Sequence, residues 1–326
     1  FLLDGRTLLN GTTAGFATSA TNPALIQPTA SNPAMNKKTG FKDLFGYNVK
    51  AGINFNIDEH SNVFANIGYY SKQPFLNAVY PNNKNFLNPN LTNEKIFGVE
   101  AGYGFRSGAF TGNLNLYRTA WSDRFLRRSL TVNGVAAYSN IEGIKEIHQG
   151  VELDASYRVS PLLSFTGMFS YGDWFYQGNA QGTLYDESNQ PIAVTGTTGA
   201  TTLYLDDVKV GGSAQTTAAV GAVLEPVKNL KFDVGYRYVD RLYANLNLLS
   251  FVYEAAGKQG SLELPSYGLL DLGMSYRIPL RDPSQYFTLR GNVYNVLNKT
   301  YISESNTNIH ANLTADQYAA INGGTV

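Results

Sequence analysis

Residues 45–57 read FGYNVKAGINFNI, a stretch in which every second side chain is apolar. The apolar positions run from Phe45 to Ile57, and Gly, Asn and Lys fill the positions between them. A period of two places alternate side chains on opposite faces of a strand, so this stretch predicts a β-strand with one apolar and one polar face. After the short link 58–61, the segment from Val63 to Tyr69 alternates in the same way. The two segments predict a hairpin.

The same hairpin pattern recurs four more times along the chain. Each recurrence pairs two alternating segments across a short link that contains Ser-Gly, Ser-Pro or another proline. The paired segments are 94–106 with 110–121, 150–159 with 163–176, 214–224 with 230–241, and 268–278 with 286–297. The sequence therefore predicts an all-β fold with ten antiparallel strands in five hairpins.

Alternation alone does not distinguish a membrane barrel from a soluble sandwich, but the lengths of the strands and of the links between them do. The segments run about 11 to 14 residues, whereas strands of soluble proteins usually have ~5–6. Very short links alternate with long ones, 177–206 and 242–265, as turns and outer loops alternate in membrane barrels. These features predict an antiparallel transmembrane β-barrel.

Charge and aromatic patterns agree with that prediction. Charged side chains of both signs gather on the face opposite the apolar one: Lys50, Glu100, Glu152, Asp154, Arg158, Lys231, Asp233, Arg237, Asp271, Arg277 and Arg290. Aromatic residues gather at both ends of the segments, as in the girdles of membrane barrels. Those beside short links are Phe55, Phe105, Phe110, Tyr157, Tyr276 and Phe287, and those beside long links are Phe45, Tyr47, Tyr69, Tyr171 and Tyr238. A general preference of aromatic residues for strands is the alternative explanation.

Composition excludes several classes of protein. The 326 residues carry 25 basic and 25 acidic side chains, so there is no net charge to attract nucleic acid. No run of ~18 apolar residues occurs, which excludes a transmembrane helix. Phe1 is followed by no signal-peptide pattern.

The chain divides into three expected regions. Residues 1–41 read as a long extracellular loop that leads into the barrel, residues 42–301 as the five hairpins, and residues 302–326 as an extracellular loop before a further strand. An open sheet edge in lipid would leave backbone groups unpaired, at several kcal/mol each. Ten strands must therefore close on themselves or join others, and the loop-like ends predict that they join others.

Four short motifs resemble those of TonB-dependent receptors, and they lie in the family's order. The first is Asn88-Pro89-x-Leu91-x-x-Glu94, and the second is Glu100-x-Gly102-Tyr103, which continues into a strand. The third is Gly150-Val151-Glu152, which resembles the opening of a later strand. The fourth, from Asn292 through Asn295 to Tyr301, resembles the penultimate barrel strand. Asn93 stands where the glycan-importing subgroup carries Trp, so the resemblance is to the general receptor type.

The resemblance implies an outer-membrane receptor of Gram-negative bacteria that takes up a scarce nutrient. It implies a barrel of about 22 strands around an N-terminal plug, of which this chain supplies about ten. The implied partners are outer-membrane lipid, the TonB complex acting through the plug, a small nutrient ligand and, as a further candidate, a surface lipoprotein. On this resemblance, the plug, the TonB box, the first half of the barrel and the closing strand are expected to lie outside this chain.

Ligand contact is expected in the long links, where aromatic residues could form a receiving surface. The candidates are Tyr80, Phe86, Trp174, Phe175, Tyr176, Tyr204, Phe251 and Tyr253. Packing of the loops on one another is an equal alternative. The charges inside the barrel either hold the plug or pair across strands, and pairing is favoured.

Catalytic, metal and cofactor sites are not expected. His60, His148 and His310 lack metal-ligand spacing to one another or to carboxylates. Asp206-Asp207 could help to bind calcium, but a solvated carboxylate pair is favoured.

Three alternatives stay open. A closed ten-stranded protease of the omptin kind would pair His148 with Glu146 or Asp173. A passive porin and a soluble all-β binding module are the others. The imported nutrient is not readable from the sequence.

Overall fold

The computed structural model describes residues 43–80, 91–132, 135–186, 190–194, 197–282, 285–306 and 308. Ten long strands lie side by side and pair antiparallel in chain order, as predicted. They are β1 (Tyr47–Asn56), β2 (Ser61–Lys72), β3 (Glu94–Arg106), β4 (Phe110–Val132), β5 (Val135–Arg158), β6 (Leu163–Tyr176), β11 (Ala214–Val227), β12 (Leu230–Tyr243), β14 (Tyr267–Pro279) and β15 (Tyr286–Val293).

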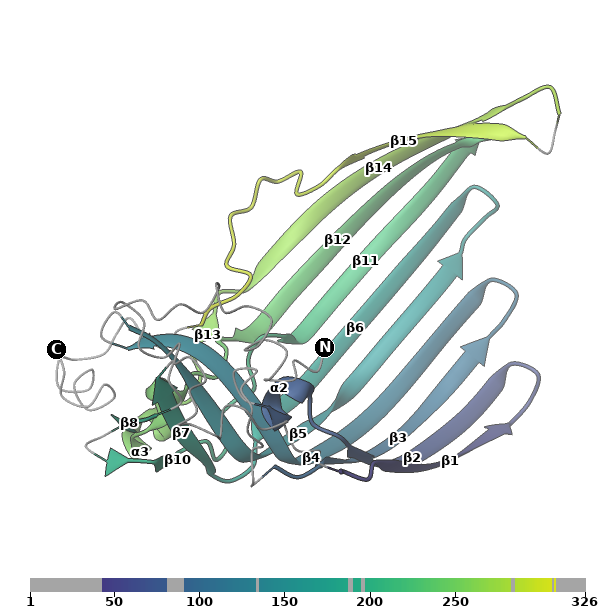
Figure 1. Ribbon diagram of the computed structural model, residues 1–326. Helices are drawn as coiled ribbons and strands as arrows, with labels where there is room; N and C mark the ends of the chain where they lie inside the picture. Colours follow the sequence, from purple (N-terminus) through teal and green to yellow (C-terminus); the bar gives the residue numbers. More distant parts are fainter. Residues whose placement is uncertain are drawn as a thin grey trace, which may run out of the picture.

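These strands form a curved wall rather than a closed cylinder. Figure 1 shows the sheet bending from β1 at the bottom to β15 at the top, with tight turns at one end and longer segments at the other. We call these the turn end and the loop end. Among the described residues, β1 and β15 are the two edges of the sheet. The predicted fold class is confirmed as a barrel-type antiparallel sheet, which is open within the described residues.

The turn end is formed by short, locally hydrogen-bonded links. Asp58 Oδ1 accepts from the backbone N–H groups of His60 at 2.8 Å and Ser61 at 2.7 Å. Asn229 adopts a φ of 73° between β11 and β12, a left-handed conformation that Asn tolerates better than most residues. These turns set the register in which Ile53 lies opposite Ala65.

The loop end contains more regular structure than the sequence predicts. The fourth and fifth strands were expected at 110–121 and 150–159, but β4 runs 23 residues and β5 runs 24. The long links hold further short elements: β7 (Ala180–Asp186), β8 (Pro191–Val194), β9 (Thr197–Thr198), β10 (Ala200–Leu203), η3 (Leu248–Phe251), α3 (Glu254–Gln259) and β13 (Glu263–Leu264). A further helix, α2 (Leu76–Val79), follows β2. No helix in the described ranges has the length and apolar character to cross a membrane.

Apolar side chains bind these loop-end elements together. They form one cluster of buried residues, here called the loop core: Ala137, Ile141, Ile144, Tyr176, Ala180, Leu184, Leu203, Leu205, Val208, Leu246, Leu248, Phe251 and Val252. Burying such side chains stabilises by about 1.5–3 kcal/mol each. The loop core therefore packs the long links together at the loop end of the sheet.

Candidate functional site

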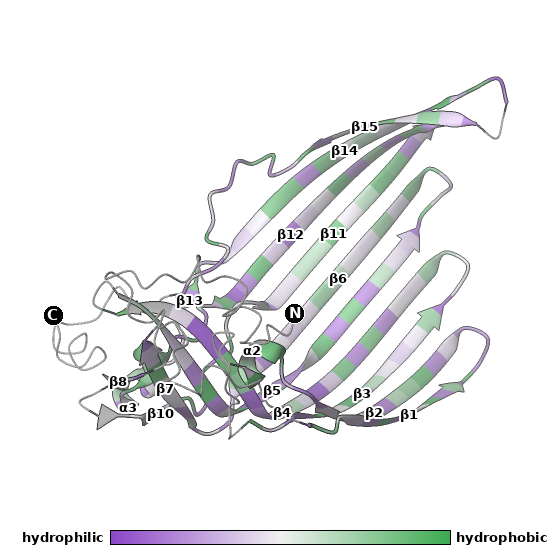
Figure 2. Cartoon of the chain, in the orientation of Figure 1, coloured by the Kyte–Doolittle hydropathy of each residue, from purple (hydrophilic) through white to green (hydrophobic). Residues whose placement is uncertain are grey.

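The convex face of the sheet carries a continuous uncharged band. Cross-strand register aligns apolar residues such as Ile53, Leu116 and Leu289 on this face, and each is at least half exposed, at 69%, 53% and 62%. Within the band, each of the ten long strands presents only apolar, aromatic or glycine side chains outward. The stripes of alternating hydropathy along the strands are visible in Figure 2. Such a band suits contact with hydrocarbon rather than water.

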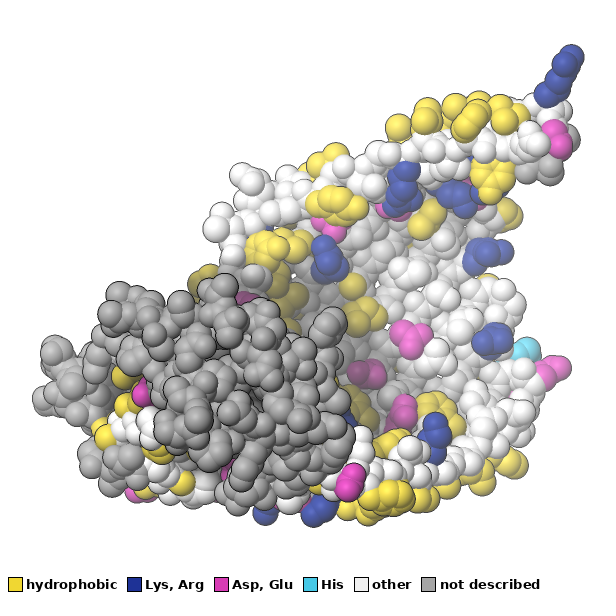
Figure 3. Space-filling model, in the orientation of Figure 1, with side chains coloured by type: hydrophobic (Ala, Val, Ile, Leu, Met, Phe, Trp, Pro, Cys, Tyr) yellow, Lys and Arg dark blue, Asp and Glu magenta, His cyan; other side chains and the backbone are white. Residues whose placement is uncertain are grey.

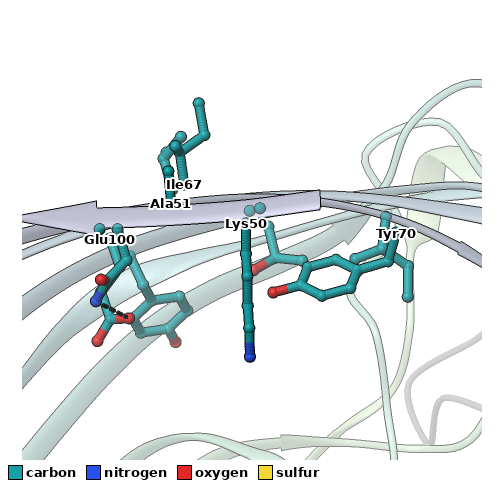
Figure 4. A pocket seen from close by; sticks show the side chains of 13 residues that line it. Lys50, Ala51, Ile67, Tyr70 and Glu100 are labelled. Atoms are coloured by element: carbon teal, nitrogen blue, oxygen red, sulfur yellow. Dashed lines mark hydrogen bonds between the residues drawn. The ribbon is translucent and has the colours of Figure 1, made fainter. Parts of the chain in front are cut away.

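The concave face is polar and hollowed. A cavity of about 690 Å³ lies against β1, β2, β3 and β4. Figure 4 shows Lys50, Tyr70 and Glu100 pointing into it while Ala51 and Ile67 point to the other side of the sheet. Figure 3 shows Lys, Arg, Asp and Glu side chains spread over the hollow of the sheet and rows of hydrophobic side chains along its upper and lower edges. The two faces therefore differ as the alternation predicts.

Several concave-face charges pair across strands. Arg237 bonds Asp271 at 2.9 Å, and Arg290 bonds Asp233 at 3.2 Å. The acidic side chains nearer β3 and β5 have amide partners instead, at 3.4 Å for Asn66 to Glu100 and 2.9 Å for Asn113 to Asp154. Arg237 and Arg290 are thus paired with carboxylates on β12 to β15, whereas Glu100 on β3 and Asp154 on β5 have neutral amide partners.

A denser group, here called the rim cluster, lies where the concave face meets the loop end. Its members are Lys72, Glu94, Arg124, Glu146 and His148. Arg124 Nε lies 2.6 Å from Glu94, and its Nη1 bonds the buried carboxylate of Glu146. Lys72 reaches Glu94 at 3.1 Å. The cluster ties β2, β3, β4 and β5 together by charge.

Aromatic rings flank the rim cluster on the same face. The His148 ring stacks on Trp174 with centroids 5.0 Å apart, and the Trp121 ring lies 6.1 Å from it on the other side. Trp174 Nε1 donates to Tyr117 Oη at 2.9 Å. Gly150 makes room for this arrangement, because a Cβ there would lie 2.7 Å from Tyr117 Oη. Flat rings and paired charges therefore line the entrance to the hollow.

Beyond the rim, the hairpin of β4 and β5 continues past two irregular positions. Asp123 has a φ of 56° and Gly143 a φ of 69°, and the pairing shifts register on both sides of Arg124. The Arg127 guanidinium lies 3.7 Å from the centre of the Tyr138 ring. Burial raises the pKa of Tyr138 to about 12, and burial lowers the pKa of Arg127. This part of the hairpin is thus packed on both faces.

The predicted aromatic receiving residues do not form one surface. Tyr176 and Phe251 are 5% and 1% exposed inside the loop core, so there the packing alternative holds. Tyr253 packs against the same core, and the Tyr204 backbone bonds Phe251. The physical reason is that apolar rings at the loop end gain free energy by packing against one another and leaving water.

The other receiving candidates lie in three places. Trp174 faces the hollow, while Phe175, the next residue of β6, lies on the convex side with Lys209 Nζ 5.3 Å from its ring centre. Tyr80 packs against Ala78, Val79 and Leu91. Phe86 lies outside the described residues. A receiving role thus stays a prediction for Trp174 and its neighbours.

The motif residues have clear structural positions. Leu91 is buried beside α2, and Glu94 belongs to the rim cluster. Glu100 faces the hollow, and Gly102 accommodates the ring of Phe64, which a Cβ would approach to 2.3 Å. Asn295 adopts a φ of 51° and holds a turn by accepting from the Lys299 backbone N–H at 2.8 Å. Asn88 and Pro89 lie outside the described residues.

The residues suggested for a protease are arranged differently from a catalytic pair. His148 Nε2 is 3.1 Å from Glu146, but Arg124 already engages that carboxylate and two indole rings flank the imidazole. Asp173 pairs in register with Gln149, on the opposite face from His148. Asp206, the calcium candidate, accepts from the Gly178 backbone N–H at 2.7 Å. In the described residues, no group of three or more His, Asp or Glu side chains is placed to hold a metal ion.

Sequence reasoning missed the rim cluster, although one signal was present. Trp121 ends the predicted strand 110–121, and Arg124 and Glu146 lie between that strand and the next predicted one. A tryptophan and charged residues at the end of an alternating segment indicate where the strand leaves the membrane. They could therefore have been assigned to the place where the concave face meets the loop end.

Comparison with protein families gives one match. A family model described as "TonB dependent receptor-like, beta-barrel" matches residues 17–296. No curated protein matches the chain by sequence.

Several solved structures share the fold at low sequence identity. A copper transporter, OprC, has a TM-score of 0.55 and 14% identity over 78% of this chain and 35% of its own. The siderophore receptor PiuA from Acinetobacter baumannii has a TM-score of 0.54 and 16% identity, with 79% and 33% covered. The FrpB iron transporter from Neisseria meningitidis has a TM-score of 0.51 and 17% identity, with 80% and 36% covered. The chain spans about a third of the length of these structures.

Proposed function

The chain belongs to the TonB-dependent receptor β-barrel family, and from this premise we propose that it forms part of the wall of an outer-membrane receptor that imports a nutrient. The loop end faces the cell exterior and the turn end the periplasm, since membrane barrels place short turns there. The rest of the protein supplies the remaining strands of a barrel of about 22 strands. TonB-coupled energy, transmitted through a plug, drives the import.

The observation that carries the proposal is the segregation of the two faces. An uncharged convex band meets lipid, and a concave face with a hollow of about 690 Å³ meets water or protein. In a soluble protein, exposing so many large apolar side chains in one band would cause aggregation. The family match supports the same placement.

Carboxylates on the concave face are the expected contacts of a plug. Glu100 and Asp154 hold only amide partners among the described residues. Cationic side chains of a domain inside the barrel would offset these charges. We assign ligand reception to the rim cluster and its flanking rings, because a molecule entering from the loop end meets Trp174 and His148 before the hollow.

The test is uptake by cells that carry the full-length receptor. A deletion strain is grown with iron, copper, cobalamin, peptide or oligosaccharide as the limiting nutrient, with and without the TonB protein. We expect a growth defect on one nutrient, which the receptor gene corrects only when TonB is present. Normal growth on all five, or correction without TonB, would contradict active import; the second outcome would favour a passive pore.

A variant separates the role of the rim from that of the barrel. Trp174→Ala removes the ring that stacks on His148, whereas Tyr236→Ala, on the convex face of β12, removes an aromatic ring that cannot meet the ligand. We expect only Trp174→Ala to lower the apparent affinity of uptake, since the burial of a large apolar side chain typically contributes ~1.5–3 kcal/mol. Equal uptake by both variants would contradict the assignment of ligand reception to the rim cluster.

A further inference from the structure

The uncharged band on the convex face ends abruptly at a line of polar residues. Toward the loop end, the apolar run on this face is interrupted by a first polar residue on each strand from β2 to β12. The residues at the change are Ser71, Lys95, Arg118, Gln149, Asp173, Thr216 and Asp240. The register places Lys95 nearer the loop end than Arg118, and Arg118 nearer the loop end than Asp240. The line of polar residues therefore slants across the strands. That slant is expected of a level boundary cut through tilted strands.

The boundary lies at the depth of lipid headgroups. From the aromatic girdle residue Phe110 to Arg118 is eight steps of β4, about 27 Å at ~3.4 Å per residue. A strand tilt of ~40° reduces this to about 20 Å, close to the apolar band of ~25 Å in membrane barrels. Arg118 therefore lies where hydrocarbon gives way to headgroups.

Polar side chains at this boundary converge on Asp173. Lys209 Nζ lies 2.7 Å from Asp173 Oδ1, and Arg241 Nη2 lies 3.7 Å from the same oxygen. Gln149 Nε2 donates to Asp173 Oδ2 at 3.4 Å, and Gln149 Oε1 accepts a hydrogen bond from Arg118 Nη1. We call Arg118, Gln149, Asp173, Lys209 and Arg241 the outer polar cluster.

Aromatic rings and a backbone oxygen hold the two long cations of this cluster in place. The Arg241 guanidinium lies 4.6 Å from the centre of the Tyr171 ring, and its Nη1 donates to the Gly172 carbonyl at 2.7 Å. Tyr171 itself is 46% exposed on the convex face, in the row directly below Asp173. The side chains of Lys209 and Arg241 are 31% and 19% exposed. They are thus preorganised and still reachable from the lipid side.

The cluster carries more positive than negative charge. Lys209 and Arg241 lie against the single carboxylate of the cluster, Arg118 bonds Gln149 instead, and Asp240 on β12 is the other acidic residue of the boundary line. The three cations of the cluster thus exceed the two carboxylates, Asp173 and Asp240, by one. The neighbouring Lys95 does not add to this excess, because Asp123 pairs with it at 2.8 Å. An uncompensated cation beside hydrocarbon is costly, and Arg groups bind phosphate through paired, charge-assisted hydrogen bonds.

We propose that the outer polar cluster binds the phosphate of an anionic lipid in the outer leaflet. The site is separate from import and depends only on the proposed membrane placement. Arg118, the exposed member, makes the first contact, and Lys209 and Arg241 close on the phosphate from the other side of Asp173. The lipid's acyl chains then lie along Leu116, Val151 and Tyr171, the next row of the band.

Native mass spectrometry of the full-length receptor in non-ionic detergent tests this site. The receptor is titrated with phosphatidylglycerol, with diacylglycerol of the same chains, and with inorganic phosphate as competitor. The double variant Arg118→Gln/Lys209→Gln is compared with Lys50→Gln/Arg158→Gln, which removes two cations of the concave face. All proteins must keep the heat-modifiable gel mobility of a folded barrel.

We expect the double variant to lose phosphatidylglycerol binding about tenfold, as expected for one or two hydrogen bonds between charged groups. The concave-face control should bind as the wild type does, and diacylglycerol should bind weakly to all. Unchanged binding in the double variant, or equal binding of diacylglycerol, would overturn the proposal. Full displacement by inorganic phosphate would instead identify a soluble-anion site and overturn the lipid assignment. Nutrient uptake by the double variant distinguishes this failure from failure of the import proposal.

Discussion

Replacing Leu114 with Arg tests the assignment of the convex face to lipid. Leu114 lies four residues from the girdle residue Phe110 and four from Arg118, which begins the polar boundary. Its cross-strand neighbours on the convex face are Tyr103 and Leu153. Four residues of strand tilted by ~40° correspond to about 10 Å of depth, so Leu114 is near the middle of the apolar band.

The expected cost follows from this depth. An Arg on the lipid face of a barrel costs about 2–4 kcal/mol at the midplane and ~0–1 near the interfaces. Leu114→Arg should therefore lower the free energy of unfolding by about 2–4 kcal/mol, and Leu116→Arg, two residues closer to the boundary, by less. Asn115→Arg is the matched control, since Asn115 lies on the concave face and bonds Glu152 at 3.4 Å. There the new guanidinium gains a carboxylate, so a change within ~1 kcal/mol is expected.

The assay is urea unfolding of the full-length receptor refolded into lipid vesicles, followed by tryptophan fluorescence. Heat-modifiable gel mobility confirms folding of each variant before titration. If Leu114→Arg and Asn115→Arg destabilise equally, the assignment of the two faces is wrong. If Leu116→Arg costs more than Leu114→Arg, the faces are right but the placement of the midplane is wrong.

Three further predictions concern the rim, the inner face and a turn. Arg124→Ala leaves the carboxylates of Glu94 and Glu146 without their shared cation. We expect the free energy of opening of β4 and β5, measured by amide hydrogen exchange, to fall by about 2–3 kcal/mol. Adding Glu146→Gln should recover part of this loss. Gly150→Ala places a Cβ 2.5 Å from the Tyr171 carbonyl and should destabilise by ~1–3 kcal/mol, whereas Gly108→Ala, with open space around it, should not; equal unfolding midpoints would contradict this. A hydrogen bond from the His60 backbone lowers the pKa of Asp58 below its ordinary 3.8, so Asp58→Asn should destabilise at neutral pH. The difference in unfolding free energy should shrink as pH falls through 3.8 and vanish below the lowered pKa of the folded state.

The sequence predicts the ten long strands because the alternation is local. A period of two assigns a face to each residue without knowledge of its neighbours in space, and Lys50 and Ala51 indeed point to opposite sides. The sequence predicts the short turns for the same reason, since Asp58 bonds within its own turn. Family motifs add the kind of barrel, and the family match bears them out.

The loop end is not predictable in this way. The backbone irregularities at Asp123 and Gly143 interrupt the period, so the continuation of β4 and β5 reads as a loop. Ile141 and Phe251 meet in the loop core although 110 positions separate them, and no local pattern reports such a contact. The sequence therefore left a receiving surface and mutual packing of the loops as equal alternatives for Tyr176 and Phe251, and burial of apolar area places both in the loop core.

Neighbouring residues of β6 serve different surfaces, and this makes its register a functional property. Asp173 organises the outer polar cluster, Trp174 faces the hollow beside His148, and Phe175 returns to the convex side. A slip of one residue between β5 and β6 would turn Trp174 to the lipid and Asp173 to the hollow. The bond between Trp174 Nε1 and Tyr117 Oη crosses from β6 to β4 and opposes such a slip. The ring that we assign to ligand reception thus also holds the lipid-facing cations at their boundary.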